Sequence, residues 1–473
     1  MSGTTLPAPA AAPQAMPSSL LTAPVLPALL RFALPNMAAM LATALATVAE
    51  TAYVGGLGVP ALAGMALVFP MVMLQMMLSG GAMGGGVASA ISRALGAGAP
   101  ARADALAVHA LWIGLAAGVA NGLLMLVWGP AIFAALGGRD AALAHAIDYA
   151  DVAFCGSVGV WLMNTFASVL RGAGNMRVPS ATFLLVSLAQ VVIGGALGLG
   201  WGPFPSLGMP GVAAGQAVAY GMGAACLFWY LRGGRSRISL SIRATPLQWH
   251  LLGDLLKVGA LACISPLQTV LTVLILTRLV AQFGATALAG YGIGARLEFL
   301  LVPISFAIGV ASVPLVGMAI GAGMAARAKR VAWIASLLAT GTLGLLGAVV
   351  AFAPGLWVDL FTVDPAVRAS AGLYFHWAGP VYGLFGLGLS LYFSALGAGK
   401  VGGLVLAGTL RLLVVAIGGW ILLQAPAEPW TVFALVALGM AVFGLSAAVA
   451  VRFTAWGHAG QAALRGAPAR PGR

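Results

Sequence analysis

The chain has 473 residues, of which 61% are apolar and only 7% are charged. Because soluble domains carry about 25% charged residues, this composition predicts an integral membrane protein. It excludes a soluble enzyme, a secreted disulfide scaffold, a disordered protein and a nucleic-acid binder, and basic cytoplasmic loops explain the net charge of +13 better than nucleic acid does.

Long apolar runs, divided by short polar or Gly/Pro breaks, predict twelve transmembrane helices in an all-α membrane fold. Each run is far longer than the roughly 9–11 residues that a barrel strand needs. The predicted spans are residues 28–54, 61–90, 106–128, 145–170, 179–200 and 209–231, followed by 253–282, 286–319, 331–353, 370–396, 401–424 and 430–454.

Basic residues predict the orientation of these spans. They gather after the even-numbered spans, as Arg171 and Arg177 do after the fourth, while the opposite loops hold few of them. Since cytoplasmic loops collect Lys and Arg, both termini are expected in the cytoplasm. Residues 1–27 would then form a flexible N-terminal tail, and residues 455–473 a basic C-terminal tail.

An internal repeat divides the chain into two halves. Three matches recur at one constant spacing, namely 95–102 with 320–327, Tyr149 with Tyr374, and 170–175 with 395–400; a fourth, 58–64 with 284–290, is displaced from it by a single position. Six spans per copy give both copies the same orientation, so the halves are expected to be parallel repeats related by a pseudo-two-fold axis along the membrane normal. The predicted bundles are residues 28–231 and 253–454, joined by a basic linker at 232–252.

Several motifs then point to one family: ETAYVGGLG at 50–58, RGAGNMRVP at 171–179, LGMPGVAA at 207–214 and the paired Gly-Ala-Gly loops. With these motifs the chain resembles the multidrug and toxic compound extrusion (MATE) transporters over residues 28–454. The resemblance implies two six-helix bundles in a V shape that export organic cations against an inward flow of H⁺ or Na⁺. No Lys-Ser/Thr pair follows the Gly-x-Gly segments, so they are not P-loops. We therefore expect no ATPase domain and no bound cofactor, and we expect an ion gradient to supply the energy for transport.

Of the ten acidic residues, five lie in loops and three lie at the ends of predicted spans, namely Asp148, Asp151 and Asp254. This leaves Glu50 and Glu298 further inside. A charged side chain at a helix centre costs about 2.5–3.5 kcal/mol on insertion scales, so a lipid-shielded glutamate can hold a proton and release it when a cation arrives. We therefore expect Glu50 and Glu298 to couple proton and cation movement. The alternatives are that Glu50 extends to the nearby outer surface, and that Glu298 forms a structural ion pair with Arg278 or Arg411.

Further polar and aromatic residues are candidates for the cavity or the substrate site, although inter-helix hydrogen bonding and an aromatic belt are equally compatible with them. These are Tyr53, Asn164, Gln190, Gln268 and Arg296. Many relatives have an acid in the fifth span where this chain has Gly194, with Gln190 one turn earlier. Apart from Asp254 at the start of the seventh span, the seventh and tenth spans also lack acids, which favours H⁺ over Na⁺ coupling.

With this resemblance the sequence predicts a proton-coupled exporter of amphipathic organic cations in the bacterial inner membrane. We expect it to contact membrane lipid and to work as a monomer. Three alternatives remain. A Na⁺-coupled drug exporter would need oxygen ligands that the acids do not supply. A lipid-linked oligosaccharide flippase would use cavity arginines, for which Arg278, Arg296 and Arg411 are available. A membrane-embedded enzyme is disfavoured, because the five histidines have no catalytic spacing.

Overall fold

The computed structural model describes residues 18–242, 245–424 and 428–456, and the regular secondary structure in these ranges is helical throughout. Eleven helices are long and apolar enough to cross a membrane, and a bent pair supplies a twelfth span. This confirms the predicted all-α fold with twelve spans. Every predicted span overlaps one of these helices or bent pairs.

Residues 25–232, here called the N-half, contain α2 (Val25–Gly56), α3 (Val59–Met76), the π-helix η1 (Met77–Met83), α4 (Gly84–Gly96), α5 (Pro100–Ala135), α6 (Asp140–Cys155), α7 (Ser157–Gly172), α8 (Arg177–Leu199) and α9 (Met209–Arg232). Residues 249–453, the C-half, contain α10 (Trp249–Ala281), α11 (Ala285–Gly321), α12 (Ala325–Phe352), α13 (Gly355–Val358), α14 (Pro365–Ala378), the 3₁₀ turn η3 (Gly379–Val381), α15 (Tyr382–Gly397), α16 (Gly402–Leu422) and α17 (Pro429–Phe453).

The helices extend beyond the predicted spans at several ends. For example, α5 covers Pro100–Ala135, whereas its apolar run predicts 106–128. Backbone hydrogen bonding continues past the apolar run until a turn stops it, so hydropathy marks the hydrocarbon core rather than the helix ends. The region expected as an N-terminal tail contains a short helix, α1 (Ser18–Thr22), and the first turn of α2; residues 1–17 of this tail and 457–473 of the C-terminal one lie outside the described residues.

Equivalent turns in the two halves share one backbone conformation. The turns before the second span, after it and after the fourth span each contain a glycine with positive φ, which residues with a side chain rarely adopt. The pairs are Gly58 (110°) with Gly284 (90°), Gly98 (73°) with Gly323 (78°), and Gly174 (81°) with Gly399 (70°). The fourth span of the N-half bends by 47° between α6 and α7, and the matching span of the C-half is interrupted by η3.

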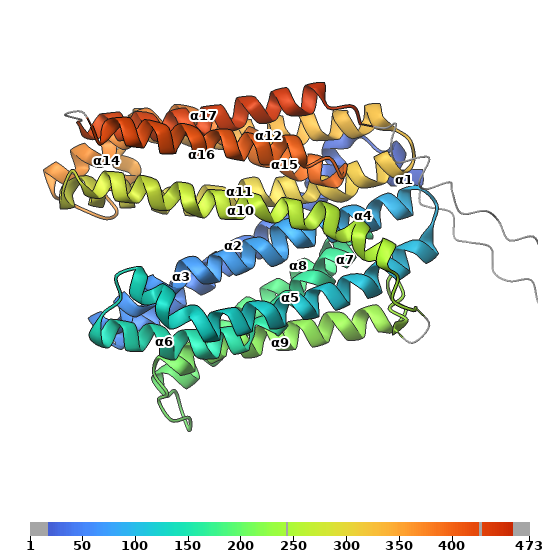
Figure 1. The fold of residues 1–473 in the computed structure, drawn as a ribbon, viewed down its shortest axis with the longest axis horizontal. Helices are drawn as coiled ribbons and strands as arrows, with labels where there is room; N and C mark the ends of the chain where they lie inside the picture. The colour runs from blue at the N-terminus through green and yellow to red at the C-terminus, as the bar shows by residue number, and fades with distance from the viewer. Residues whose placement is uncertain (1–17, 243–244, 425–427, 457–473) are drawn as a thin grey trace, which may run out of the picture.

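The first helix of each half packs at one end against the other half. In Figure 1, α2 and α10 run diagonally between the two layers in opposite senses. Near its start, α2 places Leu29 and Phe32 in an apolar cluster made mostly of C-half residues. Conversely, α10 places Leu251 and Leu255 in a cluster of N-half residues. This reciprocal exchange ties the halves together at the end where α1 and the linker between α9 and α10 lie, here called the basic end.

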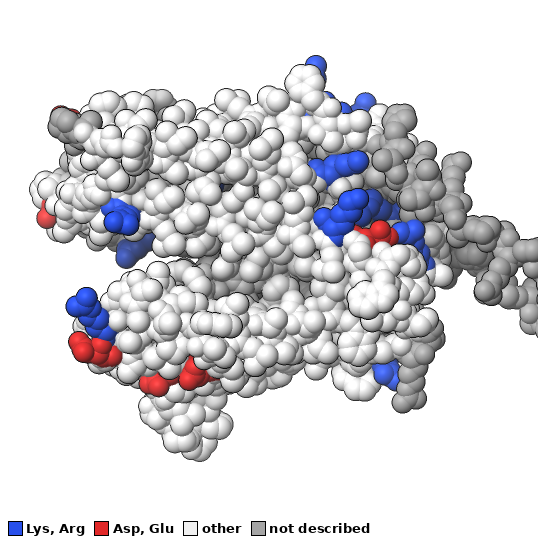
Figure 2. All heavy atoms as spheres, in the orientation of Figure 1, with Lys and Arg blue, Asp and Glu red and all other residues white. Residues whose placement is uncertain are grey.

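The opposite end, here called the far end, is where the halves separate. Figure 2 shows a cleft between the halves that is open at the far end, while most Lys and Arg on this face lie at the basic end. Polar contacts close the basic end: Ser89 of α4 donates to the carbonyl oxygens of Leu396 (2.5 Å) and Gly397 (3.0 Å) at the end of α15. Arg102 of α5 also forms an ion pair with Asp254 of α10 at 2.5 Å.

Candidate functional site

Glu50 lies in the N-half, between α2 and α8. Its side chain is 3% exposed, and its Oε1 accepts a hydrogen bond from Gln190 Nε2 at 2.8 Å. Earlier on α2, Thr43 Oγ1 lies 3.3 Å from Ser187 Oγ across the same two helices. Because residues 43 and 50 share one face of α2, and 187 and 190 one face of α8, these helices enclose a polar seam. The structure thus places Glu50 inside the helix bundle rather than at its surface.

Two buried tyrosines complete the surroundings of Glu50. Tyr149 of α6 and Tyr220 of α9 are 3% and 2% exposed, and both lie within electrostatic reach of the carboxylate. Tyr53 is one turn further along α2 and packs edge-on against Trp201, with ring centroids 5.4 Å apart. Tyr53 therefore contacts the loop after α8, at the far end of the N-half.

Gly194 lies where α8 and α9 pack closely. A Cβ on Gly194 would lie 3.3 Å from the carbonyl oxygen of Val212 and 3.8 Å from Gly215 Cα of α9. A side chain at Gly194 would therefore require α9 to shift by a few tenths of an ångström. The polar side chain that α8 directs at Glu50 is instead that of Gln190, one turn before Gly194.

Glu298 lies in the C-half, in a cage of tyrosines. Its Oε1 accepts a short hydrogen bond from Tyr374 Oη and a longer one, 3.5 Å, from Tyr382 Oη. Both phenols are buried, and Tyr291 packs edge-on against Tyr374 at 5.6 Å. Tyr374 of α14 and Tyr382 of α15 thus supply neutral donors to one carboxyl group, and Tyr291 of α11 packs against Tyr374.

Glu298 forms no direct ion pair with any residue that the structure describes. Within the described part of the chain, the ion pairs closer than 4.0 Å are Arg102–Asp254 and Arg368–Asp359. Arg411, a predicted partner, instead packs its guanidinium over Phe385 at 5.3 Å and Phe443 at 6.0 Å, although its charge still acts on Glu298. Arg278, the other predicted partner, is exposed.

The remaining predicted site residues are dispersed. Arg296 is exposed and lies over the ring of Phe361 at 5.2 Å, away from Glu298. Gln268 Nε2 donates to Thr409 Oγ1 at 2.8 Å, which links α10 to α16. Asn164 is 4% exposed and donates to Ser79 Oγ at 3.1 Å. The structure therefore brings Gln190 to Glu50, but it gathers neither Gln268, Asn164 nor Arg296 around a carboxylate.

The N-half also contains a buried chain of hydrogen-bonded polar side chains that the sequence did not predict. Gln75 Nε2 donates to Ser157 Oγ at 3.0 Å, and Ser157 donates to Asn121 Oδ1 at 3.2 Å. Ser79 Oγ donates to the carbonyl of Gln75 at 2.7 Å, beside the Asn164 contact. In the sequence, Gln75 and Ser79 lie one turn apart and are followed by Gly80 and Gly81. This pattern is the sequence signal for the buried polar residues and for the neighbouring π-helix η1.

The tyrosines near Glu50 and Glu298 could be predicted from the sequence only in part. Tyr149 and Tyr374 are a matched pair of the internal repeat; Tyr374 hydrogen-bonds to Glu298, and Tyr149 lies within electrostatic reach of Glu50. Nothing in the sequence marks Tyr382 or Tyr220 as neighbours of a carboxylate. Among the described residues, no three His, Cys, Asp or Glu side chains gather into a set that could hold a metal ion.

Comparison with known families decides the class of protein. The family model MatE matches the chain twice, at residues 35–194 and 262–421. The chain belongs to the multidrug and toxic compound extrusion (MATE) family. The two matches begin at residues 35 and 262 and cover both halves, which confirms the internal repeat. Membership makes this MATE protein a membrane transporter and not an enzyme.

Curated relatives carry several transport names. A protein named FAD transporter from Shewanella oneidensis is 26% identical over 384 residues, 80% of this chain and 83% of that protein. A probable multidrug resistance protein NorM from Thermotoga maritima is 30% identical over 347 residues, 72% of this chain and 73% of that protein. The multidrug export protein MepA of Staphylococcus aureus is 26% identical over 58% of this chain and 60% of its own.

Solved structures share the fold. A MOP superfamily transporter from Pyrococcus furiosus, described as having a binding pocket of reverse polarity, has a TM-score of 0.84 at 22% identity over 92% of this chain and 96% of that chain. A multidrug resistance MATE transporter in an outward-facing conformation gives 0.83 at 22% identity over the same shares. The likeness confirms the two-bundle fold of this MATE protein.

Proposed function

We propose that this MATE protein exports amphipathic organic cations in exchange for H⁺ by alternating access, with Glu50 as the coupling carboxylate. The observation that carries the proposal is the isolation of Glu50: it is 3% exposed, and its hydrogen-bond partner is the neutral amide of Gln190. The multidrug names of the NorM and MepA relatives support the substrate class.

A buried carboxylate without a counter-charge is costly, and either a bound proton or a bound organic cation relieves that cost. The two therefore compete for one site, as an antiporter requires. In the state that is open at the far end, a proton entering from outside displaces the cation from Glu50. After the halves rock and open the basic end, the proton leaves and the next cation binds.

Glu298 is proposed as a second coupling site with a different balance of charge. Tyr374 donates to it, and the charge of Arg411 acts on it from α16. A negative Glu298 is thus partly compensated within the protein, whereas no described residue supplies a comparable cation to a negative Glu50. We infer that Glu50 carries the exchange with substrate and that Glu298 sets the charge state of the C-half.

The proposed setting is the bacterial inner membrane, with the basic end and both termini in the cytoplasm. The gathering of Lys and Arg at that end supports this orientation (Figure 2). A monomer suffices, because the cleft lies between two halves of one chain.

The test uses purified protein in liposomes that contain ethidium, with an imposed pH gradient or an imposed Na⁺ gradient. We expect the pH gradient alone to drive ethidium transport and Glu50→Gln to abolish it. The matched control is Glu428→Gln, which removes an exposed glutamate at the far end. Transport by well-folded Glu50→Gln at the normal rate would refute the role of Glu50, and transport that needs Na⁺ would refute proton coupling.

A second candidate is transport of a phosphate-bearing substrate, such as a lipid-linked oligosaccharide or the FAD of the Shewanella relative's name. Arg278 and Arg296 favour it, because both are exposed in the C-half and neither lies within 4.0 Å of an acidic side chain of the described chain. FAD uptake into the same liposomes, lost in Arg278→Gln/Arg296→Gln but kept in Arg139→Gln, would favour this candidate over drug export.

A further inference from the structure

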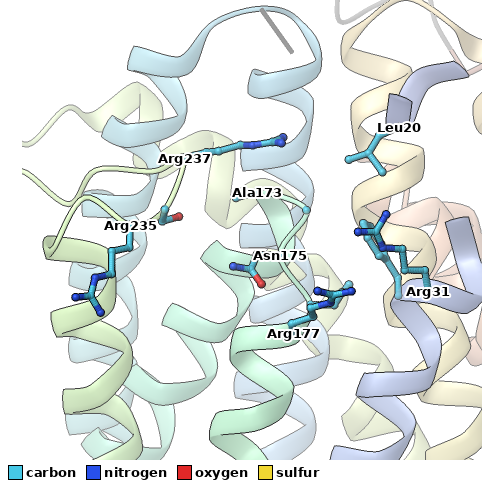
Figure 3. Close-up of a pocket in the computed structure, with 11 residues that line it drawn as sticks. Leu20, Arg31, Ala173, Asn175, Arg177, Arg235 and Arg237 are labelled. Atoms are coloured by element: carbon cyan, nitrogen blue, oxygen red, sulfur yellow. The ribbon is translucent and has the colours of Figure 1, made fainter. Parts of the chain in front are cut away.

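A pocket at the basic end of the N-half brings together arginines from separate parts of the chain. Its volume is about 360 Å³, within the range of roughly 300–1,000 Å³ that small-molecule sites occupy. Arg31 comes from α2, Arg177 from the first residue of α8, and Arg235 and Arg237 from the linker after α9. In Figure 3 the head groups of Arg31, Arg177 and Arg237 surround the pocket, while that of Arg235 points away from it.

No acidic side chain neutralises these arginines. No Asp or Glu lines the pocket within the described residues, and the segments outside that description contain neither residue type. The two acids at this end are engaged elsewhere: Asp254 pairs with Arg102, and Asp104 accepts a hydrogen bond from the backbone N–H of Ser239 at 2.8 Å. The acidic side chains of the protein therefore leave these exposed arginines without a partner, and solvent ions or a bound anion balance their charge.

Neighbouring groups add to the positive potential. Arg171, two residues before the pocket-lining Ala173, is 3% exposed, and its buried Nε has no hydrogen-bond partner. Arg177 stands at the first position of α8, where the helix dipole already favours an anion over a cation. Asn175 occupies the turn and accepts from Val178 N at 3.2 Å, which fixes the wall of the pocket. Like charges that line one pocket repel one another, and an anion bound between them relieves that repulsion.

We propose that this pocket binds a phosphate group, and that the phosphate is the head group of an anionic phospholipid. Guanidinium groups bind phosphate through two parallel N–H···O bonds, and three of them line this pocket. Basic pockets between membrane helices on the cytoplasmic side recognise anionic lipid head groups in general.

Apolar surface beside the pocket favours a phospholipid over free phosphate. On α8, Leu184 and Leu188 share the face of Arg177 and are 41% and 62% exposed. On α2, Leu34 lies one turn beyond Arg31 and is 58% exposed. A lipid whose phosphate occupies the pocket can thus lay its acyl chains along leucines of α2 or α8. This site lies at the end opposite the open cleft and is independent of the transported substrate.

The test measures lipid binding by the full-length protein in a neutral detergent. Dioleoyl phosphatidylglycerol is titrated against the wild type and Arg31→Gln/Arg177→Gln/Arg237→Gln, with bound lipid counted by native mass spectrometry and the melting temperature recorded in parallel. The matched control, Arg232→Gln/Arg330→Gln/Arg452→Gln, removes three exposed charges that do not line the pocket. We expect the pocket variant to bind the lipid roughly tenfold more weakly, and the control variant to bind within about twofold of the wild type.

Two further arms identify the ligand. Dioleoyl phosphatidylcholine supplies the same chains on a head group without net charge, and inorganic phosphate at matched ionic strength supplies the anion without chains. Stabilisation by phosphatidylglycerol alone supports the lipid, and equal stabilisation by inorganic phosphate assigns the pocket to free phosphate instead. Should the triple Gln variant not fold, Arg31→Lys/Arg177→Lys/Arg237→Lys keeps the charge and loses the paired geometry, so it should bind several-fold more weakly. Equal loss in pocket and control variants, or no loss in either, would overturn the site.

Discussion

Gly96 and Gly321 are equivalent positions of the internal repeat, and they lie on the two sides of the contact between α4 and α11. A Cβ on Gly96 would overlap the carbonyl oxygen of Met318, and a Cβ on Gly321 would overlap that of Arg93. Since Arg93 and Met318 are also equivalent positions of the repeat, the contact is self-complementary, like the interface of a two-fold dimer. The pseudo-two-fold axis therefore passes through this contact, where the basic end is closed.

Substituting Gly321 should open this closure. In Gly321→Ala the new methyl group meets backbone atoms of Arg93 and Ala97, which cannot rotate away, so α4 and α11 must separate. We expect a stability loss of about 1–3 kcal/mol and faster maleimide labelling of Cys263, which packs against the apolar clusters of both halves.

The labelling is measured in a Cys155→Ser/Cys226→Ser background, because both of these cysteines are exposed. Gly341→Ala is the control, since a Cβ there meets nothing within 4 Å. Unchanged Cys263 labelling in Gly321→Ala would show that this contact does not hold the basic end closed.

Loss of the ion pair between Arg102 and Asp254 should affect the transport rate more than the free energy of unfolding. Its side chains are 31% and 45% exposed, so its removal should cost only about 0.2–1 kcal/mol. The pair bridges the two halves, however, whereas Arg368–Asp359, with 46% and 48% exposure, lies within the C-half. We expect Arg102→Gln to change the ethidium transport rate, the swap Arg102→Asp/Asp254→Arg to restore it, and Arg368→Gln to leave it unchanged. Equal effects of Arg102→Gln and Arg368→Gln would argue against a closing role.

The contact between Gln190 and Glu50 should be coupled in stability. Gln190→Leu leaves the buried carboxyl group without its donor, at a cost of about 1–3 kcal/mol. The same change should cost less in a Glu50→Leu background, where no acceptor remains. Chemical unfolding of the four proteins of this cycle measures the coupling, and simple additivity would mean that the hydrogen bond contributes nothing.

The two phenols on Glu298 should differ in importance. Tyr374 makes the short contact with Oε1, whereas Tyr382 approaches only to 3.5 Å. We therefore expect Tyr374→Phe to lower both stability and pH-driven ethidium transport more than Tyr382→Phe does. Tyr392→Phe, which loses a bond to the Ala262 carbonyl, controls for the removal of any buried phenol. A loss in Tyr392→Phe as large as that in Tyr374→Phe would show that the effect is not specific to Glu298.

The sequence by itself determined the twelve spans, the two parallel repeats and the small set of acids that could act within the membrane. These features are local: an apolar run must cross a bilayer whatever it packs against, and a glycine with positive φ, such as Gly98 or Gly323, stops a helix through its own backbone. The repeat could be recognised in the sequence because these turn glycines recur at matching positions in the two halves.

Only the tertiary structure decided which of these residues meet. Gln190 reaches Glu50 from another helix of the N-half, Tyr374 reaches Glu298 from α14, and the arginine pocket draws on α2, α8 and the linker. Such contacts depend on how each helix is rotated and shifted against its neighbours, and composition sets neither. For the same reason the sequence did not predict that the first turns of α2 pack against the C-half and those of α10 against the N-half. From the sequence alone, each helix belongs to the bundle of its own half.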